Sequence, residues 1–437
     1  MEHDTALAVG LKKLETSKGR PSIPYMNLGV NDRTQELNIY LLSFALRCLF
    51  GLAAWWITIY THISLFEDAR IYYELGTQVA NEWLGRGSSE TLALMMTAGR
   101  DAWGMILLVA IFSFLLGGLR SAPAIIILYS LITAWGPVVT YKIARRLGIF
   151  PSAAFLGSLL VVLSPAFAFW GGALYKDGLI LLLLNLIVYY VLVLQKSVCV
   201  RSIFILSALI LALVPIRFYL PFLLLPSVGL GLLLGRMKKK PEQKFLSMIP
   251  VLVRQGLIVL VLVGLLVFSG IHKLVAHYLP EDVDGFIGLV YGTRVDSNTL
   301  AASVYLKDVE VNTPLAALKL MPIGFVYFMT VPFPWELGSL RQNLTIPEMV
   351  FWLFQYPIIL LGMRRGLNRN FRGSILLITT MVVMSCFYAV LINNAGTAYR
   401  MRSQIWLFMA IFWGWSKEKQ EIKKAMQHYI LKPSLAH

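Results

Sequence analysis

Apolar stretches long enough to cross a lipid bilayer recur along the chain from Asn38 to Trp415, with little polar sequence between them. A hydrocarbon core of roughly 30 Å takes about 20 helical residues to cross, and in lipid every backbone N–H and C=O group needs a partner within the protein. Helices meet this requirement within one segment. The composition agrees, because 57% of the residues are hydrophobic, only 14% are charged and the mean hydropathy is +0.69. The sequence therefore predicts an all-α, polytopic integral membrane protein.

Lysine and arginine account for the formal net charge of +16, and they occur in short clusters between the apolar segments. These clusters make no continuous basic face, so we do not expect nucleic acid as a partner. Basic residues beside transmembrane helices stay in the cytoplasm, so the basic N-terminal segment predicts that the first span, 38–60, runs outward. The later clusters expected inside are Lys142 with Arg145 and Arg146, Lys196 with Arg201, Arg236 to Lys240, Arg364 to Arg372, and Lys417 to Lys424.

Placing all of these clusters inside gives about ten crossings, within an architecture of about 10–12 transmembrane helices. Residues 201–236 then form a hairpin whose turn faces outward. Residues 102–141 make a net single crossing, so one of their two apolar pieces is interfacial or re-entrant. Residues 315–331 dip into the membrane as a segment broken by proline and do not cross. The expected parts are a cytoplasmic segment 1–37, a transmembrane domain 38–415 with outer loops at 62–100, 272–345 and 393–402, and a basic cytoplasmic tail 416–437.

The first expected outer loop begins with two adjacent carboxylates, Glu67 and Asp68. Ionisable groups near lipid are costly and persist mainly where they act. A carboxylate at this position could take a proton from a hydroxyl nucleophile or hold a divalent cation. The alternative is an interfacial aromatic belt with solvated charges, since Tyr72, Tyr73 and Trp83 follow at helical spacing. Apart from such a cation, the sequence indicates no cofactor.

Two short outer turns carry basic residues that could bind an anionic ligand. Lys176 could neutralise a phosphate while Asp177 orients it, or the two could form an ion pair that only closes the hairpin. Arg217 lies in a turn with no carboxylate close to it in the sequence. An anionic ligand would satisfy its guanidinium, and so would contact with the membrane interface.

The segment that opens the last span from outside combines amide groups with two guanidinium groups, in Asn394, Arg400 and Arg402. This combination suits the phosphate or diphosphate of a head group, or else lipid phosphates at the interface. A further outer segment holds Trp335 and Glu336 beside two prolines. We include both residues among the candidates for substrate binding.

Taken together, these motifs resemble the GT-C superfamily of membrane glycosyltransferases. They are Glu67-Asp68 and the tyrosine-rich stretch after it, Lys-Ile-Ala-Arg-Arg-Leu-Gly at 142–148, Ser164-Pro165 with Trp170 and Lys176-Asp177, Pro-Phe-Pro-Trp-Glu at 332–336, and Gly-Thr-Ala-Tyr-Arg-Met-Arg at 396–402. More specifically, they are similar to bacterial polyprenol-phosphate-dependent glycosyltransferases related to protein O-mannosyltransferases and the lipid A aminoarabinose transferase. The resemblance spans most of the chain, from about residue 38 to residue 415.

The resemblance implies a sugar donor carried on a polyprenyl phosphate, a glycan, lipid or protein acceptor, and an active site on the outer face of a bacterial inner membrane. It also implies a carboxylate in the first outer loop that acts as base or metal ligand. That role falls on Asp68, with Glu67 beside it. Many relatives have Asp followed by Glu, whereas the order here is reversed, so the choice between the two stays open. Lys176, Arg217 and Arg400 are the candidates for binding the lipid phosphate.

Two other functional classes compete with this interpretation. A polysaccharide polymerase or ligase of the O-antigen type needs a large outer loop with its own arginine or histidine, and His272, His277 and Arg294 meet that need. A transporter or lipid flippase is the non-enzymatic alternative. The chain shows no internal repeat, and its polar residues avoid the span centres where a transport site lies, with Arg47 as the exception. These features favour the enzyme.

Overall fold

The computed structural model describes residues 32–61, 65, 67–86, 103–235, 256, 260, 264, 283–300, 303–333, 335 and 340–431. Within these residues the regular structure is helical, apart from one isolated antiparallel bridge between Val304 and Asn394. The all-α class predicted from the sequence is therefore confirmed. The helices are α2 (Asp32–Thr61), α3 (Glu67–Trp83), α5 (Trp103–Leu115), α6 (Ala122–Thr133), α7 (Trp135–Leu147), α8 (Pro151–Leu163), α9 (Pro165–Gly172), α10 (Lys176–Lys196), α11 (Val200–Leu213), α12 (Leu220–Gly235), α15 (Val283–Leu300), α16 (Pro314–Thr330), α17 (Leu340–Arg369), α18 (Phe371–Leu391) and α19 (Ala395–Leu431).

Five helical segments in the described part of the chain are long and apolar enough to cross a membrane, which supports a polytopic membrane protein. They are Asp32–Thr61, Ala122–Leu147, Lys176–Lys196, Asn343–Arg369 and Phe371–Leu391. A sixth span results if α8 and α9, which bend by 62° at their junction, count as one broken helix. The sequence predicted about 10–12 spans. In the described part of the chain, α5, α11, α12 and α16 are apolar but shorter than a full crossing, and most of the apolar sequence around 250–270 lies outside the described residues.

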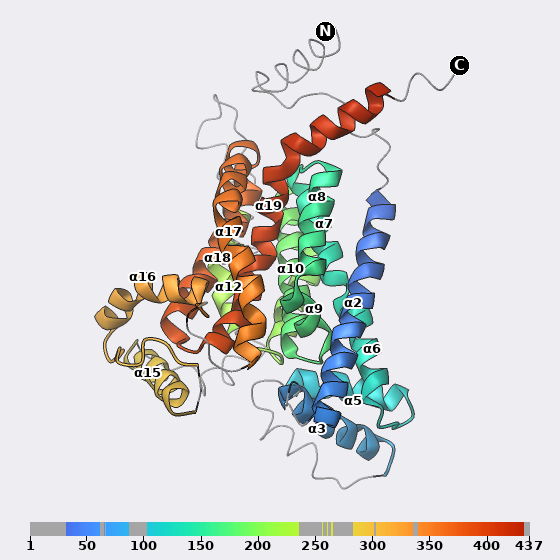
Figure 1. Ribbon diagram of the computed structural model, residues 1–437, viewed down its shortest axis with the longest axis vertical. Coiled ribbons are helices and arrows are strands. Elements are labelled where there is room, and N and C mark those ends of the chain that lie inside the picture. The colour runs from blue at the N-terminus through green and yellow to red at the C-terminus, as the bar shows by residue number, and fades with distance from the viewer. Residues whose placement is uncertain are drawn as a thin grey trace.

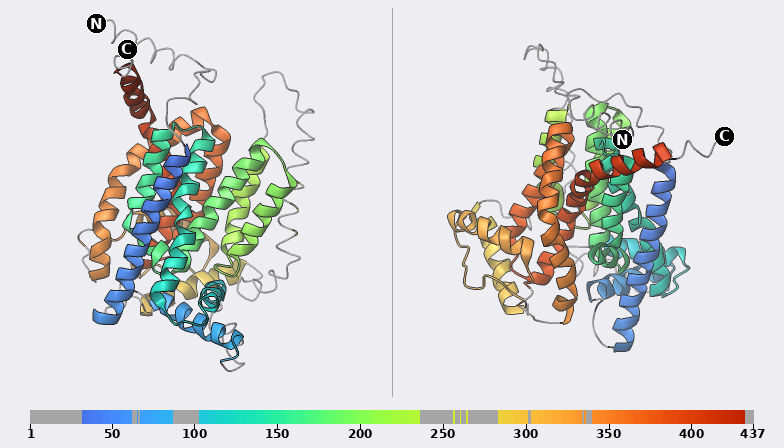
Figure 2. Two further views of the ribbon diagram at one scale, coloured as in Figure 1. Left: turned by 90° about the vertical axis from the view of Figure 1, so that its right-hand side faces the viewer. Right: turned by 45° about the horizontal axis from the view of Figure 1, so that its top comes forward.

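The long helices run side by side as one bundle, and α3 and α5 lie across one end of it (Figure 1). The first turn of α2 and the last turns of α19 lie at the opposite end, as the turned views also show (Figure 2). We call the two ends the α3 end and the α19 end. The predicted hairpin of residues 201–236 is present, because α11 and α12 are joined by a short turn at 214–219.

The sequence predicted non-crossing pieces within two apolar segments, 102–141 and 315–331. The structure differs between the two. Residues 102–141 give the short helix α5 and then α6, which continues into α7 as one span-length segment. Residues 315–331 were expected not to cross and to be broken by proline. The predicted break is absent, because Pro322 lies inside α16, which continues past it to Thr330. At 17 residues, α16 is shorter than the helices long enough to cross.

Helix α2 packs against α9 through glycine, which brings the two backbones into direct contact. A Cβ atom on Gly172 would lie 2.0 Å from the Arg47 carbonyl oxygen, so no larger residue fits there. The buried guanidinium of Arg47 lies against Gly171, and its Nε donates to Ser43 Oγ at 3.1 Å. Arg47, the ionisable residue that the sequence places within the first span, is thus held at the C-terminal end of α9, where the helix dipole favours a cation.

Cysteine labelling tests the orientation that the basic clusters predict. In a variant without the native Cys48, Cys199 and Cys386, Trp335→Cys should react with an impermeant maleimide from outside intact cells, because Trp335 is 76% exposed and precedes α17. Lys424→Cys, exposed near the C-terminal end of α19, should react only after permeabilisation. The reverse pattern would overturn the orientation. Asp177 is unsuited to this test because the structure buries it completely.

Candidate functional site

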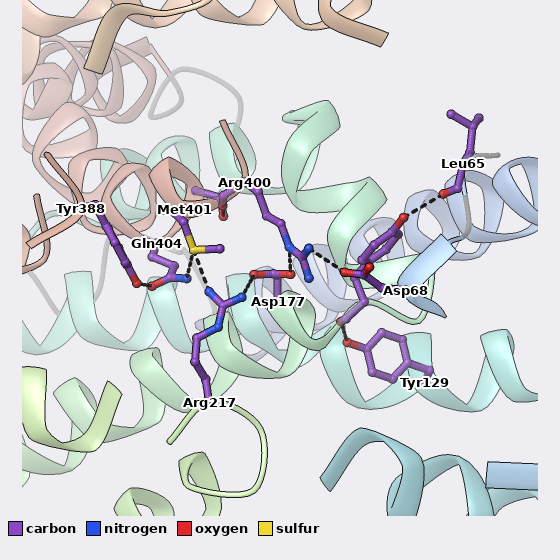
Figure 3. Close-up of polar contacts among 11 residues, drawn as sticks. Leu65, Asp68, Tyr129, Asp177, Arg217, Tyr388, Arg400, Met401 and Gln404 are labelled. Atoms are coloured by element: carbon purple, nitrogen blue, oxygen red, sulfur yellow. Dashed lines mark hydrogen bonds and ion pairs between the residues drawn. The ribbon is translucent and has the colours of Figure 1, made fainter. Parts of the chain in front are cut away.

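Four residues that the sequence singled out come together at the α3 end of the bundle (Figure 3). Arg400 on α19 is central, because its Nη1 lies 2.8 Å from Asp68 Oδ2 and its Nε donates to Asp177 Oδ2. Arg217 Nη2 lies 3.7 Å from Asp177 Oδ1. We call Asp68, Asp177, Arg217 and Arg400 the ion-pair network. Its members come from α3, α10, the α11–α12 turn and α19, so only the folded chain brings them together.

The network is buried at one side and open at the other. The exposed fraction of the side chain is 0% for Asp177, 6% for Arg217, 16% for Arg400 and 42% for Asp68. Two carboxylates and two guanidinium groups balance each other, which is what allows charges to remain in a buried site. Asp68 is therefore the member that a molecule from outside the protein reaches first.

The start of α10 is fixed tightly, and this places Asp177. A Cβ on Gly178 would lie 2.6 Å from the Tyr129 hydroxyl oxygen, so α10 begins in contact with α6. That hydroxyl donates to the carbonyl of Tyr175, and the Tyr175 hydroxyl in turn donates to Leu65 O at 3.1 Å, just before α3. Asp177 lies in the first turn of α10, where the helix dipole favours a carboxylate. These contacts also bring the start of α3, with Asp68, close to Asp177.

Aromatic rings lie against both arginines. The Arg400 guanidinium lies 5.1 Å from the ring centre of Tyr175 and 5.6 Å from that of Trp170. Arg217 lies 5.8 Å from the ring of Tyr219. Such cation–π contacts hold a guanidinium in place without using its N–H groups. The arginines therefore keep hydrogen-bonding capacity for an anion.

One N–H group on each arginine has no strong hydrogen-bond acceptor in the described part of the protein. Arg400 Nη2 is buried and forms no hydrogen bond within the described residues. Arg217 Nη1 donates to Met401 Sδ at 2.6 Å, and a thioether is only a weak acceptor. An oxyanion would be a stronger partner for both N–H groups than those that the protein provides.

Two pKa shifts outside the spans show how the site holds its charges. Burial alone would lower the pKa of Arg217, but Tyr219 and Asp177 outweigh this effect and raise the pKa above its usual value, so the guanidinium stays charged. Burial and the nearby Asp68 carboxylate raise the pKa of Tyr72, on α3, well above its usual value. Tyr72 therefore stays a neutral phenol.

The structure does not bring Asn394 and Arg402 into the network. Asn394 Oδ1 accepts from Gly396 N at 2.8 Å and so caps α19. Arg402 is completely buried and donates to the carbonyl of Val331. Residues two apart on a helix point in different directions, so Arg402 cannot join Arg400 in the network. The interpretation of both as direct ligands of a head group is not supported by these contacts.

The remaining candidates lie elsewhere or cannot be placed. Trp335 is exposed and stacks on Phe333, with ring centres 4.9 Å apart. Lys176 is half-buried beside Asp177, but two arginines bind the Asp177 carboxylate. Glu336 lies outside the described residues, and Glu67 begins α3 without a described side chain. In the described part of the chain, no three His, Cys, Asp or Glu side chains form a metal-binding group.

The sequence did not assign Trp170 and Tyr175 to the site, although both rings lie against the Arg400 guanidinium. The dense aromatic sequence around Lys176-Asp177 was the available signal for both. We also compared the chain with known proteins, and neither a family model nor a curated protein matches it. The feature that indicates a function is therefore the ion-pair network, at the α3 end of the helical bundle.

Proposed function

We propose that the protein is a membrane glycosyltransferase. It moves a sugar from a polyprenyl-phosphate carrier to a glycan, lipid or protein acceptor on the outer face of a bacterial inner membrane, in the assembly of cell-surface glycans. The observation that carries the proposal is the ion pair between the half-exposed Asp68 and Arg400, which Asp177 links to Arg217. A carboxylate and two guanidinium groups thus lie together at one end of an apolar bundle.

The proposed reaction uses each member of the network. The acceptor hydroxyl oxygen attacks the anomeric carbon of the sugar and gives its proton to Asp68. The bond between that carbon and the phosphate oxygen breaks, and polyprenyl phosphate leaves. Arg400 and Arg217 stabilise the charge on the departing phosphate, in a site where burial strengthens electrostatic interactions. Asp177 contacts no substrate in this scheme and holds the two arginines in place.

The polymerase or ligase alternative gains less support. Of its three candidate residues, His272 and His277 lie outside the described residues. Arg294, on α15, is buried and donates to Leu306 O at 3.0 Å. A guanidinium bound to the backbone in this way supports the fold of the α15 region. The network at Asp68 therefore offers a better site for chemistry than Arg294 does.

Release of the carrier tests the proposed function directly. Purified protein in detergent is incubated with polyprenyl-phosphate sugars radiolabelled in the lipid, with and without an extract that contains acceptors. We expect free polyprenyl phosphate to form, at a rate that rises when acceptors are present. Release that is equally slow with wild-type protein and with an Asp68→Asn, Arg400→Ala variant would reject the transferase.

Arginine-to-lysine variants test the phosphate contacts. Arg400→Lys and Arg217→Lys keep the positive charge but lose the forked pair of N–H groups. A hydrogen bond to a charged group contributes about 1.5–3 kcal/mol, so each variant should weaken donor binding by roughly 10- to 100-fold. Equilibrium binding of labelled donor to purified protein measures this loss. Arg70→Lys is the control, because Arg70 lies on α3 but is exposed and pairs only with Glu74 in the described residues. Unchanged affinity in the Lys and Ala variants of both arginines would remove them from the site.

A further inference from the structure

Glu348 is a buried carboxylate on α17 that neither the predicted site nor the proposed reaction includes. It lies within the span-length segment Asn343–Arg369, where a charge is costly unless it is well bound. Its two oxygens accept hydrogen bonds from the hydroxyls of Ser164 and Tyr399, from Ala166 N at 3.0 Å and from Trp352 Nε1 at 3.4 Å. Four donors from three parts of the chain thus meet at one carboxylate.

Two of these donors belong to the junction where α8 and α9 bend by 62°. The first backbone N–H groups of α9 have no partner within that helix. Ser164 occupies the N-cap position, but its side chain does not cap α9 and donates to Glu348 instead. Glu348 itself accepts from Ala166 N. A carboxylate from another helix therefore caps α9, and the helix dipole favours its charge.

The third donor connects Glu348 to the ion-pair network. Tyr399 directly precedes Arg400 on α19, so a hydrogen bond from its hydroxyl to Glu348 restricts the rotation of α19 at that point. At the other end of α9, the chain turns through Tyr175 into Asp177. Glu348 thus holds both the helix that carries Arg400 and the short helix that leads to Asp177.

We infer that Glu348 is a positioning residue, which sets Arg400 and Asp177 at the distance at which they pair. The geometric part of this inference is independent of the reaction, whereas its consequence for catalysis rests on the proposed function. The chain offers a matched control in Glu418. Glu418 is also a buried carboxylate and accepts from Phe150 N at 3.0 Å, so it caps α8 from α19. Its other partner, Arg369, lies outside the network.

A double-mutant cycle on thermal unfolding tests the geometry without any substrate. Glu348→Gln and Glu418→Gln should each lower the unfolding midpoint in detergent, because each removes a carboxylate charge at a helix N-terminus and one of its two acceptor oxygens. In an Asp177→Asn background, Arg400 has lost its buried partner. Glu348→Gln should therefore lower the unfolding midpoint less than it does in the wild-type background, by a difference of about 2 °C or more. Glu418→Gln should cost the same in both backgrounds. If the effect of Glu348→Gln, like that of Glu418→Gln, is the same in both backgrounds, Glu348 is only a helix cap and the inference is overturned.

A milder variant, Tyr399→Phe, extends the test to the ion-pair network. It also keeps the inference testable if the Glu348→Gln protein does not fold. Tyr399→Phe keeps the cap on α9 and removes only the hydrogen bond to α19. It should lower the unfolding midpoint less than Glu348→Gln does, because only one of the four donors to the carboxylate is lost. It should also lower kcat/KM for the labelled donor by roughly 10- to 100-fold, as expected for a displaced binding group. Unchanged kcat/KM in an active Tyr399→Phe protein contradicts the inference. An inactive wild-type protein contradicts the proposed function instead, and the unfolding cycle then decides on Glu348 alone.

Discussion

Replacing Asp68 with Asn is expected to lower the rate of sugar transfer by about 10² to 10⁴, which is the contribution typical of a general base. The substitution keeps the shape of the side chain and removes its basicity. Asp68 is partly exposed, and such ion pairs contribute little to stability, so the variant should fold normally and still bind the donor. Single-turnover transfer at saturating donor, measured beside the unfolding midpoint of each protein, separates these effects.

Glu67→Gln is the matched control for this prediction, because it makes the same chemical change one position earlier in α3. We expect it to reduce transfer much less than Asp68→Asn does. A loss of turnover in Glu67→Gln with near-normal turnover in Asp68→Asn would mean that the base lies one residue earlier, in keeping with the reversed order of the pair. If neither variant changes turnover, the start of α3 is an interfacial scaffold and the transferase proposal loses its chemical basis.

Asp177→Asn should cause the largest loss of stability in the network. The change removes the charge that balances Arg217 and Arg400, both of which are largely buried. Breaking a buried ion pair by removing one partner typically costs about 3–5 kcal/mol, since the remaining charge stays buried without compensation. Denaturant or thermal unfolding of the purified protein in detergent measures this loss.

Glu74→Gln provides the contrast for Asp177→Asn. Glu74 forms an exposed ion pair with Arg70 on α3, so its loss should change stability by well under 1 kcal/mol. A loss in Asp177→Asn as small as that in Glu74→Gln would show that the two arginines remain well solvated without the carboxylate. The network would then behave as an arrangement of surface charges, and Asp177 would not be needed to hold the two arginines.

The helical membrane class could be predicted because hydrophobic length is a local property, readable one segment at a time. The basic clusters also predicted that one apolar piece of residues 102–141 does not cross, and α5 agrees with this, because it has only 13 residues and lies across the end of the bundle with α3. Which of the other apolar segments form short helices could not be predicted from hydrophobicity and charge, since helix ends depend on the helices packed around them. The bend between α8 and α9 has a visible signal in Ser164-Pro165, but its angle depends on the helices packed around it.

The site was predictable to the extent that charges near the ends of spans are costly and therefore conspicuous. Asp68, Asp177, Arg217 and Arg400 were all identified in this way, although their pairing was not. Arg217 seemed to lack a carboxylate because its partner lies on a different helix pair, and only the folded bundle brings Asp177 to it. Glu348 was overlooked because it lies within an apolar segment, where a single carboxylate does not reveal its four partners.

The two helix caps described above also set an order of events in biogenesis. The N–H group of Ala166 finds its acceptor 182 residues later in the chain, and that of Phe150 finds its acceptor 268 residues later. Backbone groups without partners are costly in lipid, so α8 and α9 cannot take their final bent arrangement when they first enter the membrane. The bent junction of α8 and α9 is completed only when α17 supplies Glu348, and the start of α8 only when α19 supplies Glu418. Parts of the bundle that are synthesised early are therefore completed by parts that are synthesised late.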